Sequence, residues 1–332
     1  MDALVNLFAQ IQTWIFETLV QPWMFALGLG GFLEDGYGAT SWFMVGLLQL
    51  GVMLVVIAPL QRWRPVEPVT DRAAIRTDVI YTLIHRLGLF RMVLFFSVDP
   101  LFDDLFGVLR VAGWSTFHLD DVWPGVTDNG WVSLALYLVA FDFVNYWIHR
   151  GQHQFGWWWK LHALHHSQRQ MTMWTDNRNH LLDDLACDAL VVVVAQLIGI
   201  PPGQFVAVVA FTQLSESLQH ANLRLWFGRV GERLWVSPRF HRLHHSVGIG
   251  HESPMPPSGG SAAHEVANVG VRLGGHNFGV LLPWWDMAFG TANFELRFDA
   301  TGVRGQVEQG VDYGRGFWAQ QWLGLTRLWR SS

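Results

Sequence analysis

The amino-acid sequence predicts an all-α, polytopic membrane protein with about four transmembrane helices and a helical cap on the cytoplasmic side. Three observations support this fold class. Only 15% of the 332 residues are charged, against about a quarter in soluble domains. Residues 41–60 carry no charge and are long enough to cross a bilayer. Three short clusters hold eight of the fifteen histidines at spacings of three or four, which places the histidines of each cluster on one helix face.

The N-terminal part contains two expected membrane spans. Residues 3–30 are apolar but interrupted by polar side chains, so we expect an interfacial or loosely spanning helix. Residues 41–60 form the first span, because Arg62 and Arg64 follow it at once, as is typical of a cytoplasmic helix end. The second span covers residues 79–98, and its three basic side chains have to face protein, water or the interface.

The second half of the membrane region leads to the histidines. Residues 131–148 form the third span, which runs directly into the first histidine motif. Residues 185–200 and 205–218 are apolar runs on either side of Pro201-Pro202-Gly203, a strong turn signal. We expect them to form a helical hairpin that dips into or crosses the bilayer.

Loop charge predicts the orientation in the membrane. Residues 61–77 contain four arginines, whereas residues 99–130 contain one arginine and six aspartates. The positive-inside rule then places the first of these loops in the cytoplasm. Counting spans from there brings all three histidine motifs to the cytoplasmic face of one multi-pass integral protein, in the inner or plasma membrane if the protein is bacterial.

The histidine motifs predict a site for two metals. Neutral imidazole binds iron, zinc, copper and nickel, and eight imidazoles exceed the four ligands typical of one zinc ion. Two copies of H-x-x-H-H argue against the alternative, that aromatic-rich helices merely carry some satisfied histidines. The predicted ligands are His149-x3-His153, His162-x2-His165-His166 and His241-x2-His244-His245.

Other polar residues are placed to complete this site. His220 lies at the cytoplasmic end of the hairpin, four residues after Glu216. We expect His220 to be a metal ligand, and whether Glu216 is also a ligand stays open. Asp142 is two helical turns before His149, where its carboxylate could accept a hydrogen bond from a ligand imidazole. We expect a similar supporting role for His180 and Asn277.

The composition around the third motif predicts two further features. Ser237-Pro238 is typical of a helix start, with serine as N-cap and proline at the first helical position. Residues 246–275 are rich in Gly, Ser, Ala and Pro and show no helix or strand pattern. We expect a mobile loop, either a flap over the site or a plain surface insertion. Three histidines lie in or beside this segment and are expected to be exposed to solvent: His251, His264 and His276.

The donor set favours oxidative chemistry. An all-imidazole site leaves open positions and suits iron and dioxygen better than magnesium or calcium, which prefer oxygen ligands. Two irons can share the electrons needed to cleave O2 and attack an unactivated C–H bond, and beside a bilayer that bond belongs to an acyl chain or another lipid. A net charge of −5 gives no support for nucleic-acid binding.

At these residues the sequence resembles the fatty acid hydroxylase/sterol desaturase superfamily of membrane di-iron enzymes. The resemblance covers residues 131–292. The matching motifs are Asp142-x6-His149-Arg150-x2-His153, His162-x2-His165-His166-Ser167, Arg178-x-His180, Gln219-His220-Ala221-Asn222, Ser237-Pro238-x2-His241-x2-His244-His245-Ser246, Asn277-Phe278-Gly279 and Trp285-Asp286-x2-Phe289-Gly290-Thr291.

The resemblance implies a cytoplasmic helical cap that holds two iron ions. It also implies hydroxylation, desaturation or ether-lipid oxidation of a lipid such as a fatty acyl chain, a sterol or a polar membrane lipid, with O2 as co-substrate. We expect residues 131–295 to form the catalytic domain, with 246–275 as an insertion. Residues 1–130 then hold the interfacial helix and the first two spans, and residues 296–332 form a C-terminal tail.

Two departures from the family stand out. The connection from His245 to Asn277 is much longer than usual, and Glu216-x3-His220 replaces a frequent histidine pair. Nothing resembles a fused cytochrome b5 or flavin domain, so we expect electrons from a separate donor, such as a ferredoxin, a cytochrome b5-like protein or a reductase.

Two other classes of protein remain as alternatives. One is a histidine-rich membrane metal transporter or storage protein, although the histidines lie at the ends of the spans and not within them. The other is a membrane zinc hydrolase, although no motif contains the glutamate of H-E-x-x-H. The metal content and the need for O2 distinguish these classes.

Overall fold

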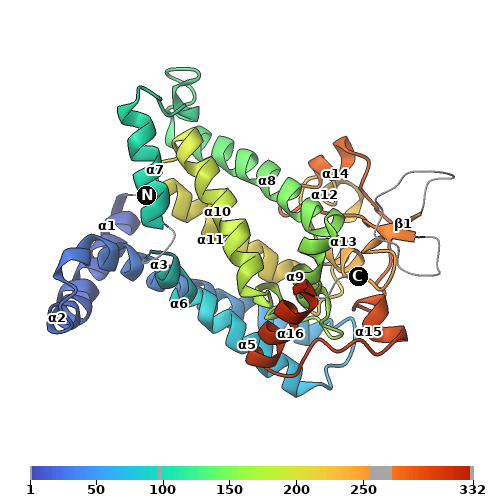
Figure 1. Cartoon of the computed structure of the whole chain (residues 1–332). Helices are drawn as coiled ribbons and strands as arrows, with labels where there is room; N and C mark the ends of the chain where they lie inside the picture. The colour runs from blue at the N-terminus through green and yellow to red at the C-terminus, as the bar shows by residue number, and fades with distance from the viewer. Residues whose placement is uncertain (1, 96–98, 255–270, 330–332) are drawn as a thin grey trace. The chain divides into compact units, whose positions relative to one another are not determined.

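The protein is mostly helical, as predicted, in a computed structural model that describes residues 2–95, 99–254 and 271–329 (Figure 1). The chain forms two compact units. One contains residues 1–52 and 83–114, and the other contains residues 53–82 and 115–332. All of the predicted metal ligands belong to the second unit.

The first unit is built from helices near the N-terminus. The helix α1 (Asp2–Ile15) continues through a π-helical turn into α2 (Gln21–Ala26), and α3 (Leu33–Val52) packs against both. The helices α6 (Leu89–Phe95) and α7 (Asp99–Val111) complete the unit.

The predicted second span, over residues 79–98, is wrong as a single helix. The helix α5 (Arg72–Arg86) ends before Gly88, and α6 starts directly after it. Gly88 has a φ of 75°, a left-handed conformation that glycine adopts readily and that terminates helices. Arg86, one of the basic side chains within the expected span, is buried.

Among the described residues, two helical stretches are long and apolar enough to cross a membrane, Gly30–Trp63 and Gly130–Gln154. They contain the first and third predicted spans. The first stretch joins α3 through a π-helical turn, Met53–Ile57, to α4 (Ala58–Trp63). Val55 in that turn is 75% exposed, as expected for a side chain that faces lipid.

The expected helical hairpin is present. The helices α10 (Leu181–Ile198) and α11 (Pro202–Gln219) are joined by a tight turn, and both pack against α8 (Gly130–Gln154). Gly199 ends α10 with a φ of 61°. A side chain there would collide with the ring of His118, so the turn requires glycine.

Shorter elements gather at the end of α8 that carries His149 and His153 (Figure 1). There α9 contacts α8, α13 contacts α11, and α16 packs on α9. The elements are α9 (Gly156–His166), α12 (Gly228–Gly231), α13 (Pro238–His244), α14 (Trp284–Ala288), α15 (Arg304–Glu308) and α16 (Phe317–Trp329).

The insertion at residues 246–275 contains strand structure, contrary to the prediction. The strands β1 (Glu252–Pro254) and β2 (Val271–Leu273) pair antiparallel, with Glu252 opposite Leu273. The pairing depends on backbone hydrogen bonds, which the side-chain pattern does not reveal. Most of the expected mobile loop, residues 255–270 with His264, lies outside the described residues.

Candidate metal centre

Nine buried histidines meet where four helices end. Two come from the last turns of α8, three from the end of α9, one from the C-terminal end of α11 and three from α13 and the residue after it. As predicted, Ser237 caps α13 by accepting a hydrogen bond of 3.1 Å from the Phe240 N–H, and Pro238 is the first helical residue. The nine are His149, His153, His162, His165, His166, His220, His241, His244 and His245.

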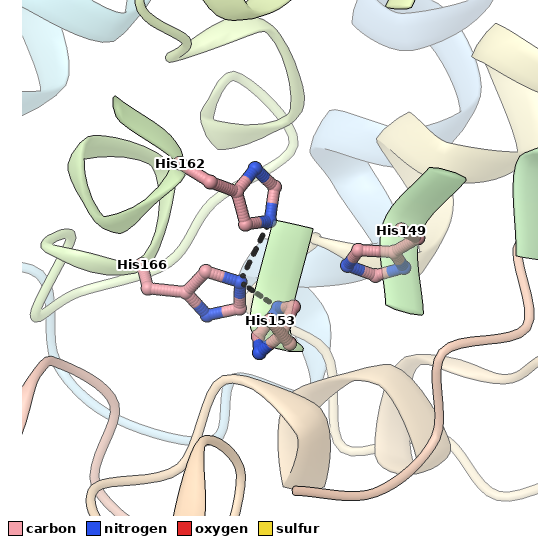
Figure 2. Close-up of side chains that lie close together, drawn as sticks. All are labelled: His149, His153, His162 and His166. Atoms are coloured by element: carbon pink, nitrogen blue, oxygen red, sulfur yellow. Dashed lines mark hydrogen bonds between the residues drawn. The ribbon is translucent and has the colours of Figure 1, made fainter. Parts of the chain in front are cut away.

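Four of them form cluster A, defined as His149, His153, His162 and His166. One ring nitrogen of each lies within 4.8 Å of the others. Figure 2 shows how the four rings lie, with His166 between His162 and His153. The Nε2 atom of His166 is 3.1 Å from Nε2 of His153 and 3.2 Å from Nε2 of His162.

The other group, cluster B, consists of His165, His220, His241 and His245. Nε2 of His220 lies 3.1 Å from Nε2 of His165 and 3.0 Å from Nε2 of His241. Nε2 of His241 is in turn 3.1 Å from Nε2 of His245. His244 lies close to a member of each cluster, His166 and His245, so it connects the two.

These distances fit bound metal ions. Two nitrogens that bind one ion at about 2.1 Å and at right angles are about 3.0 Å apart, close to the spacings between the Nε2 atoms. His244 Nε2 is buried and has no hydrogen-bond partner among the described residues. Burial and the neighbouring imidazoles lower the pKa of His165, His166 and His244 well below the usual range. Neutral rings have the lone pairs that a metal requires.

Five of the nine rings form a hydrogen bond at Nδ1, the nitrogen that faces away from the clustered Nε2 atoms. Such contacts fix the orientation and tautomer of a metal-binding imidazole and raise its basicity. The partners are the Phe278 carbonyl for His149 (2.9 Å), Asp183 for His162 (3.0 Å), His251 for His166 (2.8 Å), the Glu216 carbonyl for His220 (2.8 Å) and the His276 carbonyl for His244 (2.8 Å).

Asp183 is a site residue that the sequence analysis missed. Its buried carboxylate accepts hydrogen bonds from His162 Nδ1, from Trp158 Nε1 at 2.7 Å and from Gln152 Nε2 at 2.8 Å. Asp183 lies in the first turn of α10. Acidic residues are common at that helix position, so nothing in the sequence indicates its contact with α9.

Asp142 does not contact an imidazole, contrary to the prediction. Its carboxylate accepts hydrogen bonds from the backbone N–H groups of Leu281 (2.7 Å) and Leu282 (3.2 Å) and from Trp285 Nε1 (2.9 Å). Asp142 therefore anchors the segment after Phe278 to α8. The carbonyl of Phe278 in turn binds His149. Its support of the site is indirect.

His180 also differs from the prediction. One of its ring nitrogens lies 2.9 Å from the Gln321 carbonyl, and the other accepts the Leu182 N–H at 3.2 Å. Both nitrogens are engaged, so His180 caps α10 and holds α16, and neither nitrogen is left to support a ligand.

Asn277 supports the site through the backbone, and not by a bond to an imidazole as expected. Its side-chain amide donates to the carbonyls of Phe240 (3.0 Å) and Asn293 (3.1 Å). Its φ is 64°. The carbonyls of the residues on either side of it bind His244 and His149.

Arg178, part of a predicted motif, fixes the end of α9. It forms a buried ion pair of 2.8 Å with Asp78 and donates to the Leu164 carbonyl and to Ser167 Oγ, each at 3.3 Å. Leu164 directly precedes two of the nine histidines, so this pair helps to position their rings.

The remaining histidines and Glu216 can also be placed. His251 was expected to be exposed but is buried against His166. His276 is half-buried, and its Nδ1 lies 3.2 Å from the Ile249 carbonyl. Among the described residues, neither cluster includes a carboxylate, so Glu216 contributes its backbone carbonyl to the site.

A set of buried imidazoles at helix ends defines a polyhistidine site that could hold metal. Residues 134–291 match the model of the fatty acid hydroxylase family. The chain belongs to this family, and the membership predicted from its motifs is confirmed.

The known proteins that are similar to this chain include the following two. Ornithine lipid hydroxylase OlsE of Rhizobium tropici is 26% identical over 302 residues, which cover 89% of this chain and 81% of that protein. Alkylglycerol monooxygenase of Caenorhabditis elegans is 30% identical over 104 residues, which cover 31% of this chain and 20% of that protein. No solved structure matches.

Proposed function

We propose that this protein is a membrane di-iron oxygenase that uses O2 and external electrons to hydroxylate a C–H bond of a lipid. The observation that carries the proposal is the pair of buried, all-imidazole clusters within a fatty acid hydroxylase segment. Hydroxylation is favoured over desaturation because the two relatives are named as a hydroxylase and a monooxygenase.

Cluster A would hold one iron and cluster B the other, with His244 between them. When bound, the irons supply the activation of O2. The residues of the chain hold the ligands and control their surroundings. The Nδ1 contacts at five rings would keep their Nε2 atoms directed at bound ions.

Aromatic side chains separate the rings from water. Phe278 lies with its ring centroid 5.9 Å from that of His149, 5.2 Å from that of His153 and 5.7 Å from that of His244. The Trp159 ring lies 5.0 Å from that of His153. A dry, apolar surround protects a reactive site from side reactions with water.

The similarity to a named lipid hydroxylase supports a class of substrate. The longer match, over 89% of this chain, is to a protein named for its action on ornithine lipid. We therefore propose a polar membrane lipid as the substrate, with an amino-acid-containing lipid as the first one to test. A fatty acyl chain or a sterol is the next choice.

We further propose that the protein crosses the membrane several times and carries its metal centre on the cytoplasmic face. The arginine-rich segment at residues 61–77, which includes the loop between α4 and α5, packs directly on the histidine cap. Asn222 Oδ1 accepts the N–H of Val66 at 3.0 Å, and Arg242 binds the Glu67 carboxylate at 2.7 Å. If that loop is cytoplasmic, as the positive-inside rule indicates, the cap beside it is cytoplasmic too.

We keep residues 131–295 as the proposed catalytic domain. Residues 53–82 and 296–332 belong to the same compact unit, and Gln321 donates a hydrogen bond of 2.9 Å to the hydroxyl of Tyr81. We propose that these flanking segments brace the domain. A separate ferredoxin, cytochrome b5-like protein or reductase would deliver the electrons.

The proposal is tested by lipid mass spectrometry on cells that express the protein under 18O2. The expected product is a polar lipid heavier by one oxygen atom, with that atom derived from O2. His165→Ala should abolish the product. His118→Ala, which changes an exposed histidine beside Gly199, should preserve it.

A product that lacks the heavy isotope would argue against an oxygenase. Activity without O2 together with bound zinc would favour the hydrolase alternative. Bound metal with no change in any lipid would favour a metal carrier.

A further inference from the structure

The start of the insertion carries a histidine that reaches the metal centre. His251 directly precedes β1 and is 3% exposed. Its Nε2 atom lies 2.8 Å from Nδ1 of His166. Its ring centroid is 4.5 Å from that of His166 and 5.2 Å from that of Trp159. A histidine of a Gly- and Pro-rich segment is therefore packed into the wall of cluster A.

The direction of this hydrogen bond follows from the positions of the two nitrogens of His166. Nε2 of His166 faces Nε2 of His153 and Nε2 of His162. A neutral imidazole has one N–H and one lone pair, so a metal at Nε2 requires the proton at Nδ1. That proton is donated to Nε2 of His251. The ring of His251 accepts it through Nε2, which lies within hydrogen-bond distance of Nδ1 of His166.

The backbone around His251 is held firmly against the site. Glu252 binds Arg304 through two contacts, of 2.7 and 2.9 Å. The His251 carbonyl accepts the Gly274 N–H at 2.9 Å. A Cβ atom on Gly250 would lie 2.0 Å from the His244 carbonyl oxygen, so the close approach requires glycine. These contacts hold the base of the β1–β2 hairpin beside the metal centre.

We infer that His251 is a positioning residue, supplied by the insertion, which accepts the Nδ1 proton of His166 and so fixes the Nε2 atom of His166 toward cluster A. This inference rests on the proposed metal site. It gives the insertion a direct role in the metal centre, in addition to any effect on substrate choice.

The test measures metal retention, which is independent of turnover. The full-length protein is purified in detergent, loaded anaerobically with Fe2+ and exposed to a chelator, and the metal per chain is followed over time. In His251→Ala we expect the affinity for the ion at cluster A to fall about 10- to 100-fold, as is usual when the outer partner of a ligand histidine is removed. Cluster B should keep its ion.

A rescue variant separates positioning from general damage. In His251→Gln the side-chain oxygen can take the place of Nε2 and accept the same proton, so this variant should retain most of the metal. His118→Ala is the control, because His118 is exposed and its ring contacts the Gly199 carbonyl and neither histidine cluster. It should resemble the wild type.

Spectra of the Co2+-loaded protein provide a second readout. We expect the ligand-field bands of one of the two ions to change in His251→Ala and to remain near wild type in His251→Gln. Wild-type metal retention in His251→Ala, or equal loss in the Ala and Gln variants, would overturn the inference. If the wild type binds two metals but oxidises no lipid, the proposed function fails while the His251 result still stands.

Discussion

His149 on α8 donates a hydrogen bond of 2.9 Å to the carbonyl oxygen of Phe278, which is 129 residues further along the chain. The carbonyl of His276, two residues before Phe278, accepts a hydrogen bond of 2.8 Å from His244 on α13. One turn therefore orients a histidine from each of two helices. Asn277 lies between the two carbonyls, and its conformation determines where both point.

We predict that Asn277→Ala destabilises the protein by about 4 to 5 kcal/mol and loosens its metals. The change removes three side-chain hydrogen bonds, to the Phe240 carbonyl and to the backbone of Asn293. It also places alanine at a φ of 64°, which costs a non-glycine residue about 1 to 2 kcal/mol, while each lost bond contributes about 1 kcal/mol. Urea unfolding and metal content measure the two effects.

The control for this prediction is Asn277→Gly, which adopts the same backbone conformation without strain but also lacks the hydrogen bonds. It should lie between the wild type and Asn277→Ala in stability. Equal stability of the alanine variant and the wild type would show that the turn does not depend on Asn277.

A second prediction concerns Asp183, whose carboxylate accepts the Nδ1 proton of His162. Asp183→Asn weakens that contact, because an amide oxygen is a poorer acceptor than a carboxylate. We expect the affinity of cluster A for metal to fall about 10- to 100-fold, measured by competition with a chelator. Asp188→Asn on the same helix is the control. Similar metal affinity in both variants would remove Asp183 from the site.

The buried histidines predict a loss of stability in acid. Burial and neighbouring rings lower the pKa of His244 and His245 well below the usual range, and burial lowers the pKa of His251 to about 3. A histidine in the unfolded chain has a pKa of about 6.5. The stability from a lowered pKa is complete above that pH and is lost as the pH falls toward the folded pKa, because the unfolded chain then binds more protons.

We therefore expect the melting temperature of the metal-free protein to fall steadily as the pH is lowered from about 7 to about 5, and to change little between about 7 and 8. Scanning calorimetry in detergent measures this dependence. A melting temperature that is constant or higher in acid would mean that these rings are not held neutral by burial.

The proposed orientation predicts which residues reagents can reach. In a Cys187→Ala background, single cysteines at exposed positions report on each side of the membrane. Arg64, Gln154 and Arg229 are exposed near the histidine cap, and Asp121 is exposed in the acidic loop. We expect an impermeant thiol reagent outside the cell to label only the Asp121 position. Labelling at Arg64 from outside would reverse the proposed topology.

The sequence predicted the histidine clusters well because their residues lie on helices or directly after them. Spacings of three and four residues determine a shared face locally, and the serine–proline start at Ser237 marks the third helix. The structure accordingly brings all nine expected imidazoles together. The helical character of the chain and its family membership followed from the same local patterns.

Contacts between distant segments could not be predicted in this way. Asp142 lies two turns before His149, and the helical spacing suggested contact, but its carboxylate binds backbone at Leu281. His251 lies in a segment whose composition does not indicate burial, and its burial depends on a long-range contact with His166. The break at Gly88 was missed because hydropathy alone does not register a left-handed turn.

The most direct test of the account is the metal content of the purified protein and of two variants. We expect two irons per chain in the wild type, and at most one in His165→Ala and in His244→Ala, with membrane insertion intact in both. Each change opens one cluster or the connection between them. Iron content equal to that of the wild type in both variants, or a wild type that binds no iron under anaerobic ferrous loading, would contradict the assignment of these histidines to a di-iron centre.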